Sequence, residues 1–170
     1  MNKAATNRQI METYYKSINQ GDFDTVINLM SEDVIFHMIG TGPFSGRWEG
    51  RDRVYGELVP SVMKSFKPET VEFAGKWKIM CADEERAVGL MTGKAETTEG
   101  TDFETTYCQI FKIENSKIIE VYEFLDTELN AKTHDPANLN SEADDYGTVS
   151  YTHLRAHETS LHLVCRLLLE

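Results

Sequence analysis

The first 66 residues place apolar side chains three and four positions apart, which is the spacing of one buried helix face. This pattern predicts three helices, over residues 7–18, 23–30 and 53–66. Between the second and third helices, "SEDVIFHMIG" predicts a strand, and the Gly-rich "TGPFSGRWEGRD" predicts a loop.

From Thr70 onward the apolar positions alternate, which predicts β-strands. The short connectors "DEE", "EGTD" and "ENS" separate four such segments: "TVEFAGKWKIMCA", "RAVGLMTGKAETT", "FETTYCQIFKI" and "KIIEVYEFLDT". These connectors favour antiparallel hairpins, because a parallel crossover needs about a dozen residues. Helices followed by a strand meander predict an α+β fold. We expect a cone, with three helices packed on one face of a curved antiparallel sheet and enclosing an apolar pocket.

The composition narrows the class of partner. The chain has a formal net charge of −11, whereas nucleic acid and anionic membranes both need a basic surface, so we expect neither as a partner. No signal region or membrane-length apolar run is visible, and three widely spaced cysteines (Cys81, Cys108 and Cys165) fit a reducing compartment. We therefore expect a cytoplasmic protein. No H-E-x-x-H, P-loop or paired-cysteine motif occurs, so we expect no metal and no other cofactor.

Three segments resemble a known family. "YYKSINQGDFDTVINLMSEDVIFHM" resembles the opening of the ketosteroid-isomerase and SnoaL-like polyketide-cyclase proteins, within the nuclear transport factor 2-like (NTF2-like) superfamily. "GPFSGRWEGRDRV" resembles the connector before their third helix, and "YCQIFKIENSKIIEVYEFLDT" resembles their closing hairpin. The resemblance implies a deep pocket for a small apolar molecule and a homodimer through the sheet. The resemblance covers a SnoaL-like domain (1–130). The residues that follow are acidic and poor in apolar side chains, which predicts a loose tail (131–147) before a terminal segment (148–170).

The resemblance also implies roles for particular residues. Tyr14 matches a Tyr that donates a hydrogen bond to a developing enolate, and Gln109 matches a second donor, although its amide cannot act as an acid. Phe36 stands where steroid isomerases carry a proton-shuttling Asp, with His37 beside it. Glu123 matches the acid–base carboxylate of the polyketide cyclases.

Each candidate also has a structural interpretation. Tyr14 fits a packed core aromatic equally well, and a lone His at a strand end, such as His37, is more often structural than catalytic. Gln109 lies in an apolar strand and needs a hydrogen-bond partner if it is buried. Strand alternation puts Glu123 on one face with Val121 and Leu125. If that face lines the pocket, Glu123 is a buried carboxylate; otherwise it is a solvated or dimer-interface charge.

The expected ligand-binding residues are mainly apolar. Trp48 covers the pocket mouth or anchors its loop. The full set is Phe36, Trp48, Tyr55, Met91, Tyr107, Phe111, Val121 and Leu125.

Three functions remain open at this point. The first is an isomerase or cyclase that transfers a proton on a small apolar carbonyl compound, with Glu123 or His37 as the base and with Tyr14 and Gln109 polarising the carbonyl. The second is a binding module with the same pocket and no chemistry, and the third is a domain that mainly dimerises.

The end of the chain resembles something other than protein. Its residues His153, His157, His162 and Cys165 suggest a metal site by spacing alone. Translated back into codons, however, "VSYTHLRAHET" and "LVCRLLLE" resemble the two ends of a transposase-based sequencing adapter. We therefore interpret residues 148–170 as non-native and expect no metal site there.

Overall fold

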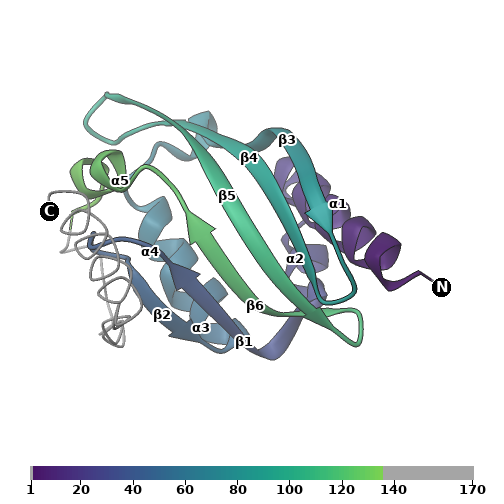
Figure 1. The fold of residues 1–170 in the computed structure, drawn as a ribbon. Helices are drawn as coiled ribbons and strands as arrows, with labels where there is room; N and C mark the ends of the chain where they lie inside the picture. The colour runs from purple at the N-terminus through teal and green to yellow at the C-terminus, as the bar shows by residue number, and fades with distance from the viewer. Residues whose placement is uncertain (1, 136–170) are drawn as a thin grey trace, which may run out of the picture.

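The computed structural model describes residues 2–135, and these form helices packed against one curved sheet (Figure 1). The helical segments are α1 (Lys3–Gln20), α2 (Phe23–Leu29), α3 (Arg51–Arg53), the π-helix η1 (Val54–Leu58), α4 (Val59–Met63), the 3-10 helix η2 (Pro68–Thr70) and α5 (Thr127–Thr133). The strands are β1 (Met30–Met38), β2 (Gly46–Glu49), β3 (Glu72–Ala82), β4 (Arg86–Glu96), β5 (Asp102–Glu114) and β6 (Lys117–Phe124). The predicted α+β class is confirmed.

The sheet has the order β2-β1-β6-β5-β4-β3. The hairpins between β3 and β6 are antiparallel, as the short connectors predict. The sheet as a whole is mixed, because β1 runs parallel to β6. Periodicity could not reveal this pair, since it joins distant segments. The predicted glycine-rich loop also contains β2, which pairs with β1.

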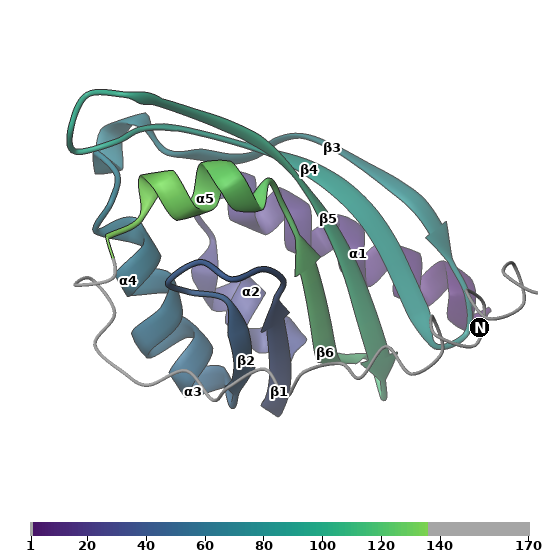
Figure 2. The same cartoon turned by 60° about the vertical axis from the view of Figure 1, so that its left-hand side comes forward.

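The helices α1 to α4 lie on one face of the sheet, and α5 lies across one end (Figures 1 and 2). Along β5, buried residues alternate with exposed or half-buried ones over the whole strand, so one of its faces is the inner face. The inner face of α1 is the one that its helical spacing predicts, with Ile10, Met11, Tyr14 and Tyr15 all buried. The core therefore fills the space between α1 and the concave side of the sheet.

The predicted helix over residues 53–66 is interrupted by a π-turn and ends at Met63. The Val59 backbone N–H donates to the carbonyl of Val54, five residues back. Pro60 follows and has no N–H to give to the ladder, so the regular spacing of four is not available at that position. Tyr55 lies inside this π-turn.

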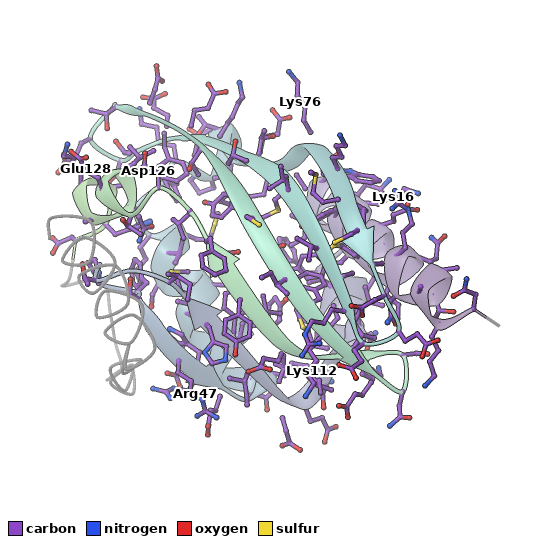
Figure 3. The ribbon with its side chains drawn as sticks, viewed as in Figure 1. Lys16, Arg47, Lys76, Lys112, Asp126 and Glu128 are labelled. Carbon is purple, nitrogen blue, oxygen red and sulfur yellow. The ribbon has the colours of Figure 1, made fainter. Side chains whose placement is uncertain are left out.

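The prediction of a loose tail from residue 131 is wrong for its first residues, because α5 runs to Thr133. Asp126 caps α5 by accepting hydrogen bonds from the backbone N–H groups of Glu128 and Leu129, both at 3.0 Å. Figure 3 places Asp126 and Glu128 together at the start of this helix. Helix α5 ends at Thr133 and its C-cap residue, His134, is buried, so the packed domain extends beyond the predicted boundary at 130.

His134 packs among the rings of Phe44, Phe66 and Phe103, with centroids 4.8, 5.4 and 6.5 Å away. Its Nδ1 is 2.8 Å from the Ser65 hydroxyl. Burial lowers the pKa of His134 from 6.5 to about 4, so the ring is neutral at physiological pH. The predicted adapter segment, 148–170, lies outside the described residues.

Candidate functional site

Strand register builds a row of four residues across the concave face. Gly89 on β4 pairs with Gln109 on β5, Gln109 pairs with Glu123 on β6, and Glu123 pairs with Met38 on β1. Paired residues share a face of the sheet, so the row points toward α1. Glu123 is only 6% exposed, which answers the question that alternation left open: its face is the inner one.

Gln109 donates a hydrogen bond to the Glu123 carboxyl group. Its Nε2 donates to Glu123 Oε2 at 2.6 Å, and Gln109 itself is 1% exposed. Burial raises the pKa of Glu123 from 4.5 to about 7, and the hydrogen bond from Gln109 opposes this rise only in part. A carboxyl with a pKa near 7 can both accept and return a proton at physiological pH.

Tyr14 extends from α1 to the same cluster. Its ring packs edge-on against Phe111 at 4.9 Å, and its phenol is hydrogen-bonded to Tyr55 and Gln109. Both bonds lower the pKa of Tyr14, as donors to its oxygen do. Burial and the neighbouring Glu123 outweigh them and raise this pKa, so Tyr14 stays protonated. Its own O–H can then be donated to a bound molecule.

Tyr55 comes from the π-turn η1. Its pKa is raised well above the ordinary value by burial, by Tyr14 and by Glu123. A π-turn inside a helix changes the direction of the side chains beside it, and such turns are frequent at functional sites. The sequence placed Tyr55 among the lining residues, but gave no signal that it bonds to Tyr14.

The predicted lining residues surround this cluster to different degrees. Most of them are buried, whereas Tyr55 and Leu125 are partly buried and pack against the core. Trp48 is fully buried, and its indole N–H donates to the Phe44 carbonyl, so it is part of the core. Cross-strand pairing aligns several of them in two rows beside the polar one: Trp48, Phe36, Val121 and Phe111 in the first, and Tyr107 and Met91 in the second.

His37 does not belong to the cluster. It pairs with Tyr122, and its ring stacks on the Tyr122 ring at 4.2 Å on the outer face of the sheet. Its Nε2 lies 2.8 Å from Glu120 Oε1. Because neighbours along a strand point to opposite faces, the inward position of Phe36 puts His37 outside.

Two hollows occur elsewhere on the described part of the chain. One, of about 580 Å³, lies beside α3 and is lined by charged residues such as Glu32, Arg51 and Arg53. The other, of about 200 Å³, lies over β3 and β4 near Trp77. The polar cluster lines neither of them. Among residues 2–135, no group of His, Cys, Asp and Glu side chains is arranged to hold a metal ion.

Comparison with known families decides the affiliation. A family model described as a SnoaL-like domain matches residues 11–121, which is more than half of the chain. The chain belongs to the SnoaL-like domain family. The match spans both Tyr14 and Gln109 and ends two residues before Glu123.

Solved structures show the same fold as this SnoaL-like chain. A protein of unknown function with a cystatin-like fold from Xanthomonas campestris has 25% identity and a TM-score of 0.66, over 79% of this chain and 100% of its own. Bal32a, from a soil-derived mobile gene cassette, has 22% identity and a TM-score of 0.66, over 78% and 97%. A candidate polyketide cyclase from Pseudomonas putida has 21% identity and a TM-score of 0.61, over 79% and 99%.

NTF2-like proteins of Burkholderia also match, so the predicted cone is confirmed. A search of curated proteins gave no match. Within residues 2–135, no helix is long and apolar enough to cross a membrane.

Proposed function

We propose that this SnoaL-like protein binds a small apolar carbonyl compound at the cluster of Tyr14, Tyr55, Gln109 and Glu123, and that it isomerises or cyclises this compound by proton transfer. One observation carries the proposal. Glu123 is a buried carboxyl with a pKa of about 7, and it lies in the same cluster as a protonated phenol that can stabilise an oxyanion.

The roles follow from the hydrogen bonds. The Glu123 carboxylate removes a proton from the carbon beside the carbonyl, and the electron pair of that C–H bond moves to the carbonyl oxygen. Tyr14 donates its O–H to this enolate oxygen, and the bonds that Tyr55 and Gln109 make to Tyr14 strengthen the donor. Glu123 then returns the proton at another carbon. Alternatively, the enolate carbon attacks a second carbonyl and closes a ring, and the alkoxide formed from that carbonyl takes the proton from Glu123.

Two kinds of support favour this reaction class. The chain shares its fold with a candidate polyketide cyclase and with an LEH-like epoxide hydrolase from M. tuberculosis, although these relatives are at most 21% identical. The apolar residues around the cluster also keep water away, which strengthens the electrostatic interactions within it.

The test uses 2-tetralone, an apolar ketone with acidic protons beside its carbonyl. Exchange of these protons in D2O, followed by proton NMR, reports the first proton transfer directly. In Glu123→Gln we expect the protein-catalysed rate to fall by about 10²–10⁴-fold while 2-tetralone still binds. Glu120→Gln is the matched control, because Glu120 lies on the same strand but on the outer face beside His37 and Tyr122. Equal exchange in wild type and Glu123→Gln would refute the assignment of the base.

A second function is a binding module without chemistry. It is favoured by Phe36, which is buried where the family resemblance expects a proton-shuttling Asp. The same experiment separates the two: a wild-type protein that binds 2-tetralone, measured by calorimetry, without accelerating exchange is a binding module.

We also propose a homodimer through the outer face of the sheet. Leu90, Cys108 and Ile110 are partly exposed there, and Phe124 is 41% exposed. Apolar side chains gathered on one sheet face favour association. Sedimentation of the wild type and of Phe124→Lys tests the proposal, which fails if both sediment as monomers.

A further inference from the structure

Two polar atoms near the proposed site are buried without a hydrogen-bond partner among residues 2–135. They are Gln109 Oε1 and the Tyr15 hydroxyl oxygen. Gln109 is 1% exposed and Tyr15 is fully buried. Such atoms are rare, because leaving one unpaired forfeits its hydrogen bonds to water without replacing them. Two of them beside one buried carboxyl therefore need a common explanation.

The Tyr15 hydroxyl lies close to the strand pair that carries Gln109. A Cβ on Gly89 would lie 2.7 Å from the Tyr15 hydroxyl, so this oxygen sits directly over Gly89. Gly89 pairs with Gln109 across β4 and β5, and paired side chains begin only about 4.5–5.5 Å apart. Tyr14 and Glu123 also contribute to raising the pKa of Tyr15, after burial, which indicates that its phenol is close to the cluster.

The amide of Gln109 cannot turn to pair its oxygen with these neighbours. Its Nε2 donates to Glu123 Oε2, and Gln109 also hydrogen-bonds Tyr14. Rotation by half a turn would point Oε1 at the Glu123 carboxylate, where two acceptors would face each other, and would lose the Nε2 hydrogen bond. The acceptor therefore stays directed away from Glu123, with the Tyr15 O–H as the nearby unpaired donor.

We propose that Tyr15 and Gln109 form a subsite for a ligand hydroxyl, so that the substrate is a hydroxylated carbonyl compound. The ligand hydroxyl accepts a hydrogen bond from the Tyr15 O–H and donates one to Gln109 Oε1. A second carbonyl in this place would leave Oε1 unpaired, whereas a hydroxyl satisfies both atoms. This inference rests on the proposed function, because the carbonyl of the same molecule has to lie at Tyr14 and Glu123.

The experiment compares 2-tetralone with a set of isomeric hydroxy-2-tetralones, which carry one hydroxyl group at different ring positions. We expect at least one isomer to bind wild type about tenfold or more tightly than 2-tetralone, since a site built to pair a hydroxyl discriminates against the analogue without it. In Tyr15→Phe this preference should fall below about threefold, with the affinity for 2-tetralone itself unchanged. Tyr122→Phe is the matched control, because it removes a phenol hydroxyl from the outer face, where Tyr122 bonds to Glu120.

Tyr15→Phe should also melt no earlier than wild type without ligand, because the hydroxyl it loses has no partner to leave behind. If Tyr15→Phe melts at or above the wild-type temperature without ligand, and binds the hydroxylated probe more weakly than wild type, then the hydroxyl of Tyr15 serves binding and not the stability of the fold.

Three results would overturn the inference. In the first, 2-tetralone binds and no hydroxylated isomer gains affinity, which leaves the proposed function standing. In the second, the gain survives in Tyr15→Phe, as it would if a water molecule occupied the subsite. In the third, none of the compounds binds, and the proposed function falls together with the subsite. The first comparison needs only wild-type protein, so it does not depend on how the variant folds.

Discussion

Replacing Glu123 by Gln should make the protein more stable at neutral and alkaline pH, although it removes the proposed base. The carboxyl has an ordinary pKa of 4.5 and a pKa of about 7 in the folded chain. Between these two values the folded protein holds a proton that the unfolded chain has lost. The free energy of unfolding therefore decreases as pH rises through this window, and it levels off above pH 7.

The magnitude follows from the two pKa values. Each rise of one pH unit inside the window lowers the free energy of unfolding of the wild type by about 1.4 kcal/mol. From pH 5 to pH 8 the wild type should lose about 2.5 kcal/mol through this carboxyl alone. Glu123→Gln has no proton to lose, and its side-chain oxygen can still accept the Gln109 hydrogen bond. It should therefore match the wild type near pH 5 and exceed it by about this amount at pH 8.

The assay is urea unfolding of both proteins at several pH values, followed by the fluorescence of the buried Trp48. The tyrosines whose pKa values Glu123 raises stay protonated throughout this pH range, so the difference between the two curves isolates position 123. A difference that stays constant from pH 5 to pH 8 would mean that the folded carboxyl has an ordinary pKa. The assignment of Glu123 as an acid–base group near neutrality would then be lost.

Four further outcomes are expected. Tyr14→Phe should lower the rate of 2-tetralone exchange, measured by NMR, about 10²–10³-fold, as loss of one oxyanion donor does. The exchange rate of the wild type should rise with pH and reach half its maximum near pH 7, where Glu123 loses its proton. Gly89→Ala should cost about 1–3 kcal/mol in urea unfolding, because its Cβ would lie 2.7 Å from the Tyr15 hydroxyl; an unchanged stability would contradict this close packing. The pKa of His134 is lowered from 6.5 to about 4, so the unfolded chain binds a proton that the folded chain does not. The free energy of unfolding of the wild type should therefore fall by about 1.5 kcal/mol from pH 6.5 to pH 5, and that of His134→Asn should not show this fall.

Local patterns predicted much of the fold because they act within single elements. Helical spacing identified the inner face of α1, with Tyr14 on it, and alternation put Glu123 and Val121 on one face. The helix that Asp126 caps was not predicted, because the acidic segment after it has few apolar positions. Its burial depends on the aromatic rings that surround His134, which come from three other parts of the chain.

The site could be predicted only in part, since its hydrogen bonds depend on register and on non-local pairing. Whether Gln109 reaches Glu123 is set by the alignment of β5 with β6, which no periodicity determines. The interaction of Tyr55 with Tyr14 requires the π-turn beside Pro60. His37 was considered as a base because it neighbours Phe36 in sequence, but adjacent residues of a strand face opposite ways.

The parallel pairing of β1 with β6 has a consequence for how the protein is made on the ribosome. Strand β1 is synthesised early, yet one of its two neighbours in the sheet is β6, the last strand within residues 2–135. During translation the apolar inner side of β1, including Phe36, has to wait for β6, and contacts between distant segments form slowly. The row that holds Gln109 and Glu123 is therefore completed last, so the nascent chain acquires its candidate site only when the whole sheet closes.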